Sequence, residues 1–191
     1  MNTDKKQAIV QAATKSFALF GYKATTMEQV AKMAKVGKGT IYLYFPTKEH
    51  LLKEIIQNTA EKMTFIAKQY TDTNKSFIEN IQLLLEKIME FREQHELTIK
   101  LYQEVNEIGT PEVIEALNDL EQKICKFIET NIIKAIEKGE IRPCHPKLTA
   151  FLMFKTYITL LNDWNKQYEP ISIKEIAALI NNYFILGLRA K

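Results

Sequence analysis

One stretch near the N-terminus, Thr25 to Phe45 (TTMEQVAKMAKVGKGTIYLYF), constrains the fold more than any other part of the chain. Its apolar residues recur at the three-and-four spacing of one helix face and then of a second, with a short break between the two runs. The two runs are Met27, Val30, Ala31 and Ala34, and then Ile41 and Phe45. The stretch therefore predicts two short helices joined by a tight turn.

Local signals support both helices. Thr25 and Thr26 stand three residues before Glu28 and Gln29, which is the capping-box spacing in either register. Gly37 lies between the runs, and a glycine takes the left-handed conformation at a helix end without a side-chain clash, so we expect it to form the corner. A helix, a short turn and a second helix is the arrangement that places its second helix in the DNA major groove.

The distribution of charge is more informative than the net charge of +3. Residues 1–50 hold eight lysines and only Asp4, Glu28 and Glu49 as acids, a net +5, which leaves −2 for the remainder. A basic head on a mildly acidic body is expected if one end meets a phosphate backbone. Lysines that simply solvate a surface helix explain the charge equally well.

Composition and periodicity predict an all-α chain of about nine helices. Six glycines and five prolines are spread over 191 residues, and the segments between them keep a helical period. We expect a three-helix DNA-binding head over 1–48 and a helical dimerisation body over 49–191. Cys125 and Cys144 are isolated, so neither a disulfide framework nor a metal site is expected, and no cofactor is implied. The start MNTDKK lacks an apolar segment and no apolar run reaches a membrane span, so the expected location is cytoplasmic.

The last two expected helices, 147–167 and 173–189, are apolar around most of their circumference. Such helices must be covered on more than one side. We therefore predict that they pack on the core with one face and on a second copy with the other, in a two-fold four-helix interface. A central helix hidden within one subunit is the alternative. The expected interface residues are Phe151, Ile158, Leu161, Ile176, Leu179, Ile180, Tyr183 and Phe184.

Residue chemistry suggests the DNA contacts of the second helix. Lys38 supplies a cation, Gly39 permits close backbone approach, and Thr40 offers a hydroxyl and a methyl group. Tyr42 and Tyr44 can donate hydrogen bonds to phosphate, although either could instead pack within the head. Thr26 and Lys48 flank this helix and are expected to hold phosphates. The DNA-binding candidates are Thr25, Thr26, Lys38, Gly39, Thr40, Tyr42, Tyr44 and Lys48.

The span from Gln7 to Leu52 resembles the N-terminal domain of TetR-family transcriptional regulators. The resemblance rests on F-x-x-x-G-Y-x-x-T-T from Phe17 to Thr26 and on V-x-K-G-T-I-Y-x-Y-F-x-x-K-E-x-L-L from Val36 to Leu52. It implies nine helices, three of which read DNA, an effector-binding body, and dimerisation through the last two helices. It further implies repression that is released when a ligand moves the connector helix. The chain has leucine at 43 and tyrosine at 44, where histidine is frequent in the family, so the operator sequence stays open.

The body offers weaker signals. Candidate effector contacts are Met89, Tyr102, Phe127, Phe154, Tyr157 and Trp164, with Glu104 or Asn118 as polar partners, although residues of these types are more often plain core. The alternatives to a repressor are an activator or a regulator without a ligand. A helical-bundle enzyme is remote, because no Glu-x-x-His pair, complete phosphate loop or nucleophile with a local base is present.

Overall fold

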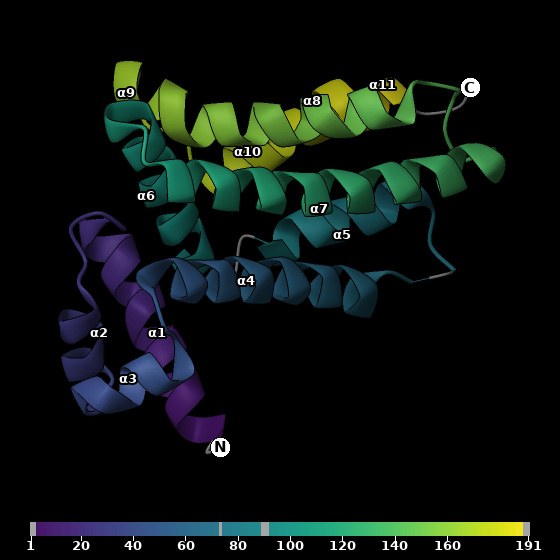
Figure 1. The fold of residues 1–191 in the computed structure, drawn as a ribbon. Coiled ribbons are helices and arrows are strands. Elements are labelled where there is room, and N and C mark those ends of the chain that lie inside the picture. The colour runs from purple at the N-terminus through teal and green to yellow at the C-terminus, as the bar shows by residue number, and fades with distance from the viewer. Residues whose placement is uncertain (1–2, 73, 89–91, 189–191) are drawn as a thin grey trace. The chain divides into compact units, whose positions relative to one another are not determined.

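The structure is a computed structural model that describes residues 3–72, 74–88 and 92–188. These residues form helices and no strand. Figure 1 shows their order. The head region holds α1 (Thr3–Phe20), α2 (Met27–Met33) and α3 (Lys38–Tyr44). The remaining elements are α4 (Lys48–Tyr70), α5 (Phe77–Ile88), α6 (Arg92–Ile108), α7 (Pro111–Glu137), α8 (Pro146–Thr159), η1 (Leu160–Trp164), α9 (Asn165–Gln167), α10 (Ile173–Ile180), η2 (Asn181–Ile185) and α11 (Leu186–Leu188).

The all-α prediction is confirmed, with one local difference at the C-terminus. The sequence predicted two continuous helices there, and the structure interrupts each with one π-helical turn, η1 and η2. When each π turn is taken together with the α-helices that it joins, the described residues form nine helices, as expected. A π turn inserts a residue into the helical ladder, which changes the face presented by the residues that follow.

The chain forms two compact units, and α4 and α7 contribute to both. The first comprises Met1–Thr59 and Arg92–Leu120, and the second comprises Ala60–Phe91 and Glu121–Lys191. The functional division at 48/49 stays a prediction. As a packing unit, however, the DNA-binding region also includes α6 and the beginning of α7.

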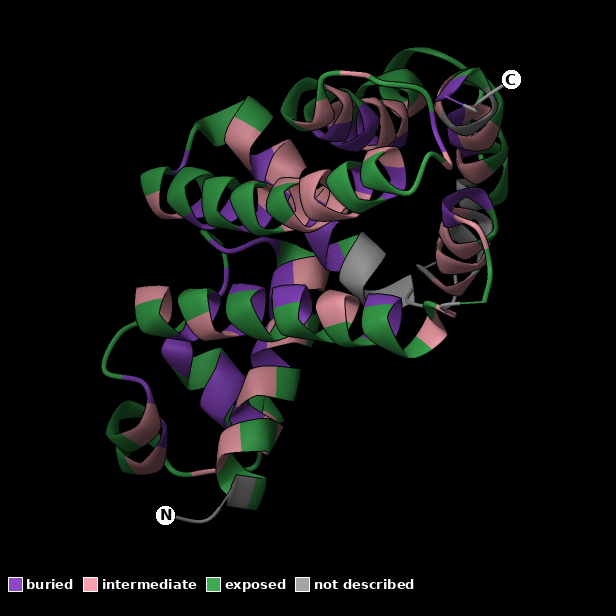
Figure 2. Ribbon diagram, turned by 90° about the vertical axis from the view of Figure 1, so that its right-hand side faces the viewer, coloured by how far each residue is buried: buried purple, intermediate pink, exposed green. Residues whose placement is uncertain are grey.

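The first unit has a continuous apolar core in which α6 packs along α1. Side chains from each helix are fully covered, as shown by Phe17 of α1, Ile41 of α3 and Leu101 of α6, each 0% exposed. Buried and exposed positions alternate along the helices in Figure 2, as expected for helices with one covered face. This core fixes α1 to α3 on a base that includes α6.

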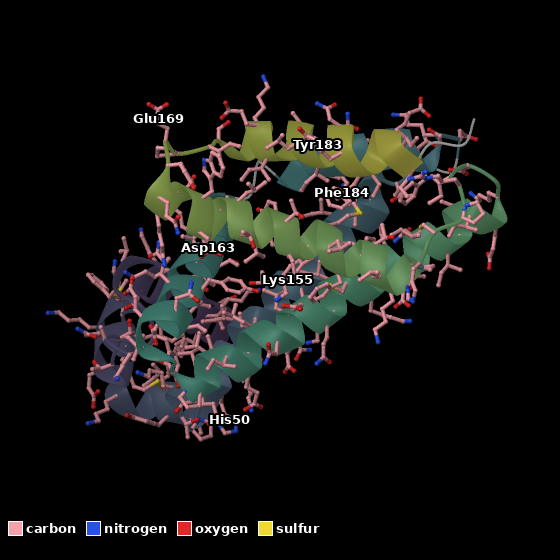
Figure 3. The ribbon with its side chains drawn as sticks, turned by 90° about the horizontal axis from the view of Figure 1, so that it is seen from above. His50, Lys155, Asp163, Glu169, Tyr183 and Phe184 are labelled. Atoms are coloured by element: carbon pink, nitrogen blue, oxygen red, sulfur yellow. The ribbon has the colours of Figure 1, made fainter. Side chains whose placement is uncertain are left out.

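The second unit buries part of the predicted dimer interface within the chain itself. Ile158, Leu161, Ile176 and Ile180 are buried by neighbouring helices. Phe151 and Tyr183 are exposed, and Leu179 and Phe184 are half-buried. Figure 3 labels Tyr183 and Phe184 on the last helical segment and Lys155 on α8. Four of the eight predicted residues therefore keep exposed surface that a second copy could cover. The other four already pack inside the unit.

No helix among the described residues is long and apolar enough to cross a bilayer.

Candidate DNA-binding site

The beginning of α2 is defined by a capping box at Thr26. The Gln29 amide donates to Thr26 Oγ1 at 3.2 Å, and the Thr26 amide donates to Gln29 Oε1 at 2.8 Å. This is one of the two registers that the sequence allowed. Thr26 is exposed, so its hydroxyl lies at the surface beside two amides at a helix N-terminus, where an anion is favoured.

The corner between α2 and α3 lies at Lys35 and not at Gly37. Lys35 has φ of 54°, whereas Gly37 has φ of −70° and ψ of 154° and serves as the N-cap of α3. The Val36 amide donates to the Ala31 carbonyl at 3.0 Å and the Lys35 amide donates to the Lys32 carbonyl at 3.2 Å, which is the hydrogen-bond pattern of a Schellman helix end. The expected left-handed glycine was wrong, because α2 ends at Met33 and the left-handed residue that follows its C-cap is Lys35, two residues before the glycine.

Helix α3 is anchored by one residue and exposes the others. Ile41 is fully buried, whereas Lys38 and Gly39 are exposed and Tyr42 is 39% exposed. A Cβ atom added at Gly39 would meet nothing within 4 Å, so this position leaves open space at the first turn. Thr40 and Tyr44 are half-buried. The outward face of α3 therefore carries a cation, a bare backbone turn and a phenol.

Lys38 is paired in the absence of DNA. Its Nζ lies 2.7 Å from Glu28 Oε1, and both side chains are more than half exposed. The hydrogen bond from Lys38 lowers the pKa of Glu28, and the same bond raises the pKa of Lys38. An exposed pair of this kind is weak. A phosphate can therefore replace Glu28 as the partner of Lys38 at small cost.

Two of the predicted DNA contacts are engaged inside the head. Thr25 is 1% exposed, and its hydroxyl donates to the Gly21 carbonyl at 2.8 Å and lies 3.0 Å from Ser16 Oγ. Thr25 therefore closes the turn between α1 and α2 and offers no side chain to DNA. The Lys48 ammonium donates to the carbonyls of Tyr22 at 2.8 Å and Thr25 at 2.9 Å.

The side chain of Lys48 also stabilises this turn. Its Nζ lies 4.3 Å from the centre of the Tyr22 ring, which adds a cation–π contact to the two carbonyl bonds. Partial burial lowers the pKa of Lys48 and, mainly by removing the phenol from water, raises the pKa of Tyr22 to about 12. Carbonyl partners favour the charged ammonium, so Lys48 holds the turn as a cation.

A buried carboxylate holds the same turn from α6. Glu104 is 5% exposed, and its oxygens accept the Lys23 amide at 3.1 and 3.2 Å and the Thr110 hydroxyl at 2.8 Å. Gly21, with φ of +86°, lets the turn approach closely, since a Cβ there would lie 2.8 Å from Glu104 Oε2. The sequence suggested Glu104 only as a polar partner of an effector. The one sequence signal for its structural role was its position shortly before the predicted corner at Gly109-Thr110-Pro111, where it bonds Thr110.

The predicted effector contacts do not gather in one place. Tyr102 belongs to the first unit, and Met89 lies outside the described residues. In the second unit Phe154 is buried, and burial raises the pKa of the Tyr157 phenol. Trp164 is 41% exposed and its Nε1 donates to the Glu169 carbonyl at 3.0 Å.

Phe127 lines two hollows of the second unit. Asn118, suggested as a polar partner, is exposed in the first unit. No cluster of three or more metal-ligating residues occurs in the described part of the chain.

A capped α2, a tight corner and an α3 with one buried anchor and a polar outer face define a helix-turn-helix DNA-binding protein. Residues 9–55 match the model of the tetR family of bacterial regulatory proteins. The chain is also 47% identical over 190 residues to the uncharacterized HTH-type transcriptional regulator YhgD of Bacillus subtilis (strain 168), with 100% of both chains covered. The chain belongs to the TetR family, and it is a transcriptional regulator and not an enzyme.

Solved structures agree with this fold along the whole chain. A TetR-family regulator from Rhodococcus sp. superposes with a TM-score of 0.83 at 18% identity, covering 99% of this chain and 100% of that one. A transcriptional regulator from Saccharomonospora viridis, solved in complex with choline, superposes with a TM-score of 0.80 at 15% identity and covers 100% of both chains. At these identities the likeness concerns the fold.

The support of the α1–α2 turn leads to a first prediction. Glu104→Ala removes the acceptor of two buried donors, and hydrogen bonds to a charged group each contribute about 1.5–3 kcal/mol. We expect a lower free energy of unfolding and at least a tenfold loss of operator affinity, about 1.4 kcal/mol, because the turn that positions α2 loosens. Urea unfolding and fluorescence anisotropy with labelled operator measure the two effects. Glu107→Ala, an exposed acid of the same helix, is the control, and equal behaviour of both variants contradicts the role of Glu104.

The corner at Lys35 leads to a second prediction. A left-handed conformation costs an L-residue roughly 1–2 kcal/mol, and Lys35→Gly removes this cost. Glycine also gives the unfolded chain more conformational freedom, which lowers the free energy of unfolding by about 0.5–1 kcal/mol. Lys35→Gly is therefore neutral or stabilising. Lys32→Gly, placed in the last turn of α2, should lower stability by about 1 kcal/mol. Thermal unfolding of the two variants compares them directly, and a destabilised Lys35→Gly protein would place the corner elsewhere.

Proposed function

We propose that the protein is a homodimeric repressor whose complex with operator DNA dissociates when a small-molecule effector binds in the second unit. The observation that carries the DNA-binding part is the face of α3, where Lys38, Gly39 and Tyr42 point outward from an anchored Ile41. Base edges and phosphates in a major groove are recognised by cations, hydroxyls and close backbone approach of this kind.

Exposed apolar side chains on α8 and η2 support dimerisation through the C-terminal helices. Leu148, Phe151 and Leu152 of α8 are 51%, 41% and 45% exposed, and Tyr183 is 75% exposed. Residues three and four apart share one helix face, so the three α8 side chains form one stripe. A two-fold axis through such a stripe joins identical surfaces and supplies the paired heads that a two-fold operator needs.

The neighbour that was solved with choline supports a body able to accept a small molecule. In this chain the hollows beside Phe127 offer the space for an effector. Glu104 of α6 is hydrogen-bonded to the backbone of the α1–α2 turn. A displacement of α6 would therefore move this turn and, with it, the DNA-binding face. A ligand releases DNA only by as much as its affinity differs between the bound and released states.

Two other regulators share the same head. An activator raises transcription from a promoter that carries the bound site, and a regulator without a ligand keeps its operator in every effector screen. In vitro transcription on fragments selected from genomic DNA, followed by a small-molecule release screen, separates the three. Repression that a ligand reverses supports the proposal, whereas stimulation of transcription overturns it.

A third prediction concerns Tyr42 and Lys38. Tyr42→Ala should weaken the selected operator complex by about tenfold or more, because a base or phosphate contact is lost, with little change in the salt slope. Lys38→Ala should reduce the slope of log affinity against log salt by about 1, because one phosphate contact is released.

Anisotropy titrations at several salt concentrations measure both effects. Tyr168→Ala, which removes an exposed tyrosine outside the head, is the control and should bind like the natural protein. Unchanged operator affinity in Tyr42→Ala counts against α3 as the reading helix.

A fourth prediction concerns assembly. Leu152→Glu puts a charge into the exposed stripe of α8 and should raise the dimer dissociation constant at least tenfold, because a carboxylate buried against apolar partners without a counter-charge is costly. Analytical ultracentrifugation over a concentration series measures it. Phe65→Glu, at a 65% exposed position of α4, is the matched control. A normal dimer from Leu152→Glu moves the interface away from this stripe.

A further inference from the structure

Two hollows of the second unit share a wall and differ in chemistry. The first, the apolar hollow, has a volume of about 200 Å³, and its lining combines Phe77, Ile81, Leu84 and Phe127 with polar and charged side chains. The second, the basic groove, has a volume of about 750 Å³ and is lined by Lys68, Lys123, Lys126 and Lys134. Thr71, Phe127, Asn131 and Lys134 line both. The end of α4 and the second half of α7 line both hollows, and α5 lines the first; together the two hollows form one composite site. Figure 1 shows these three helices.

The basic groove carries uncompensated positive charge. Its lining contains four lysines and no acid. Lys126 is paired with Glu129 at 3.1 Å, but Lys68, Lys123 and Lys134 form no ion pair with any residue that the structure describes. Three like charges around one concavity repel one another and raise the local concentration of anions. The occupant that relieves this repulsion is negatively charged.

The hydroxyls of the groove are already committed as donors. Each threonine hydroxyl donates to the backbone carbonyl four residues before it, at 2.8 Å for Thr64, 2.6 Å for Thr71 and 2.8 Å for Thr130. The lysine ammonium groups are therefore the charged donors that the groove offers to a ligand anion, beside the amide of Gln122. This favours an anionic head over a neutral polar one, which would need donors and acceptors of a more varied kind.

Two acids, Asp72 and Glu140, line the apolar hollow, and neither lines the basic groove. Asp72 Oδ1 accepts the Asn74 amide at 2.9 Å, and Glu140 accepts the Phe77 amide and lies 3.7 Å from Lys138. Both carboxylates are thus bound to the backbone around the beginning of α5. Aromatic and aliphatic side chains in the same lining, Phe77, Ile81, Leu84 and Phe127, favour a hydrocarbon occupant.

We propose that this composite site binds an amphiphilic anion, with a hydrocarbon part in the apolar hollow and a phosphate or carboxylate head among Lys68, Lys123 and Lys134. Phe127 and Asn131 lie at the boundary, where the chain of the ligand meets its head. That this ligand is the effector rests on the proposed function. Binding itself is measured separately from the release of DNA.

The test uses the full chain and four probes, each kept below its micelle concentration. Dodecyl phosphate and dodecanoate carry both parts of the proposed ligand, dodecyl glucoside carries the chain without charge, and inorganic phosphate carries the charge without a chain. Isothermal titration calorimetry measures the affinity of each. We expect one or both anionic amphiphiles to bind at least tenfold more tightly than the two incomplete probes, and the tighter of them identifies the head group.

The matched variants locate the site. Lys68→Gln, Lys123→Gln and Lys134→Gln are combined in one protein, which should lose about tenfold or more in affinity because three charge contacts are removed. Lys147→Gln, Lys166→Gln and Lys174→Gln, all exposed in the same unit and outside the groove, change the net charge equally and should leave the affinity unchanged. Circular dichroism melting curves establish that both triple variants fold.

Each remaining outcome decides the matter. Equal losses in the two triple variants indicate general charge attraction and overturn the site, as does unchanged affinity in the groove variant. If neither dodecyl phosphate nor dodecanoate binds more tightly than inorganic phosphate and dodecyl glucoside, the amphiphilic ligand is overturned. Amphiphile binding that is lost in the groove variant but leaves operator affinity unchanged supports the site and removes the effector-release part of the proposed function.

Discussion

The DNA-binding region depends on how the short turn from Gly21 to Thr25 is held between two charged side chains. Glu104 accepts a backbone amide of this turn, and Lys48 donates to two of its carbonyls. An unpaired carboxylate or ammonium at such a depth is costly, so each charge is stable only while the turn keeps its shape. The N-cap of α2 follows directly after the turn. The position of the reading helices is therefore set partly by a residue that lies 81 positions further along the chain.

Local signals in the sequence predicted the parts of the fold that depend on local physics. Apolar periodicity found the helices, and the capping-box spacing found the beginning of α2, where Thr26 and Gln29 form the box. These features depend on neighbours within one helical turn, which a sequence displays directly. The motif around α3 likewise identified Ile41 as an anchor and Tyr42 as a surface residue.

Features that depend on distant partners could not be found in the same way. Lys35 takes the left-handed corner because α2 ends before Gly37, and glycine preference alone does not decide between the two. Thr25 is a good capping residue by type, but the fold directs its hydroxyl to Gly21 and Ser16. The all-round apolar pattern of the last helices did not distinguish contacts within the chain from contacts with a second copy. The π turns at Leu160 and Asn181 leave no periodic signal at all.

The packing of α6 against α1 has a consequence for exchanging parts between related regulators. A chimera that joins residues 1–48 of one protein to the body of another separates Gly21 and Lys23 from the Glu104 with which they are matched, and it leaves the covered face of α1 against a foreign helix. A graft of residues 1–59 together with 92–120 keeps the complete first unit. The transferable module of operator recognition in this protein is thus discontinuous, and substitutions in its two segments are expected to accumulate together.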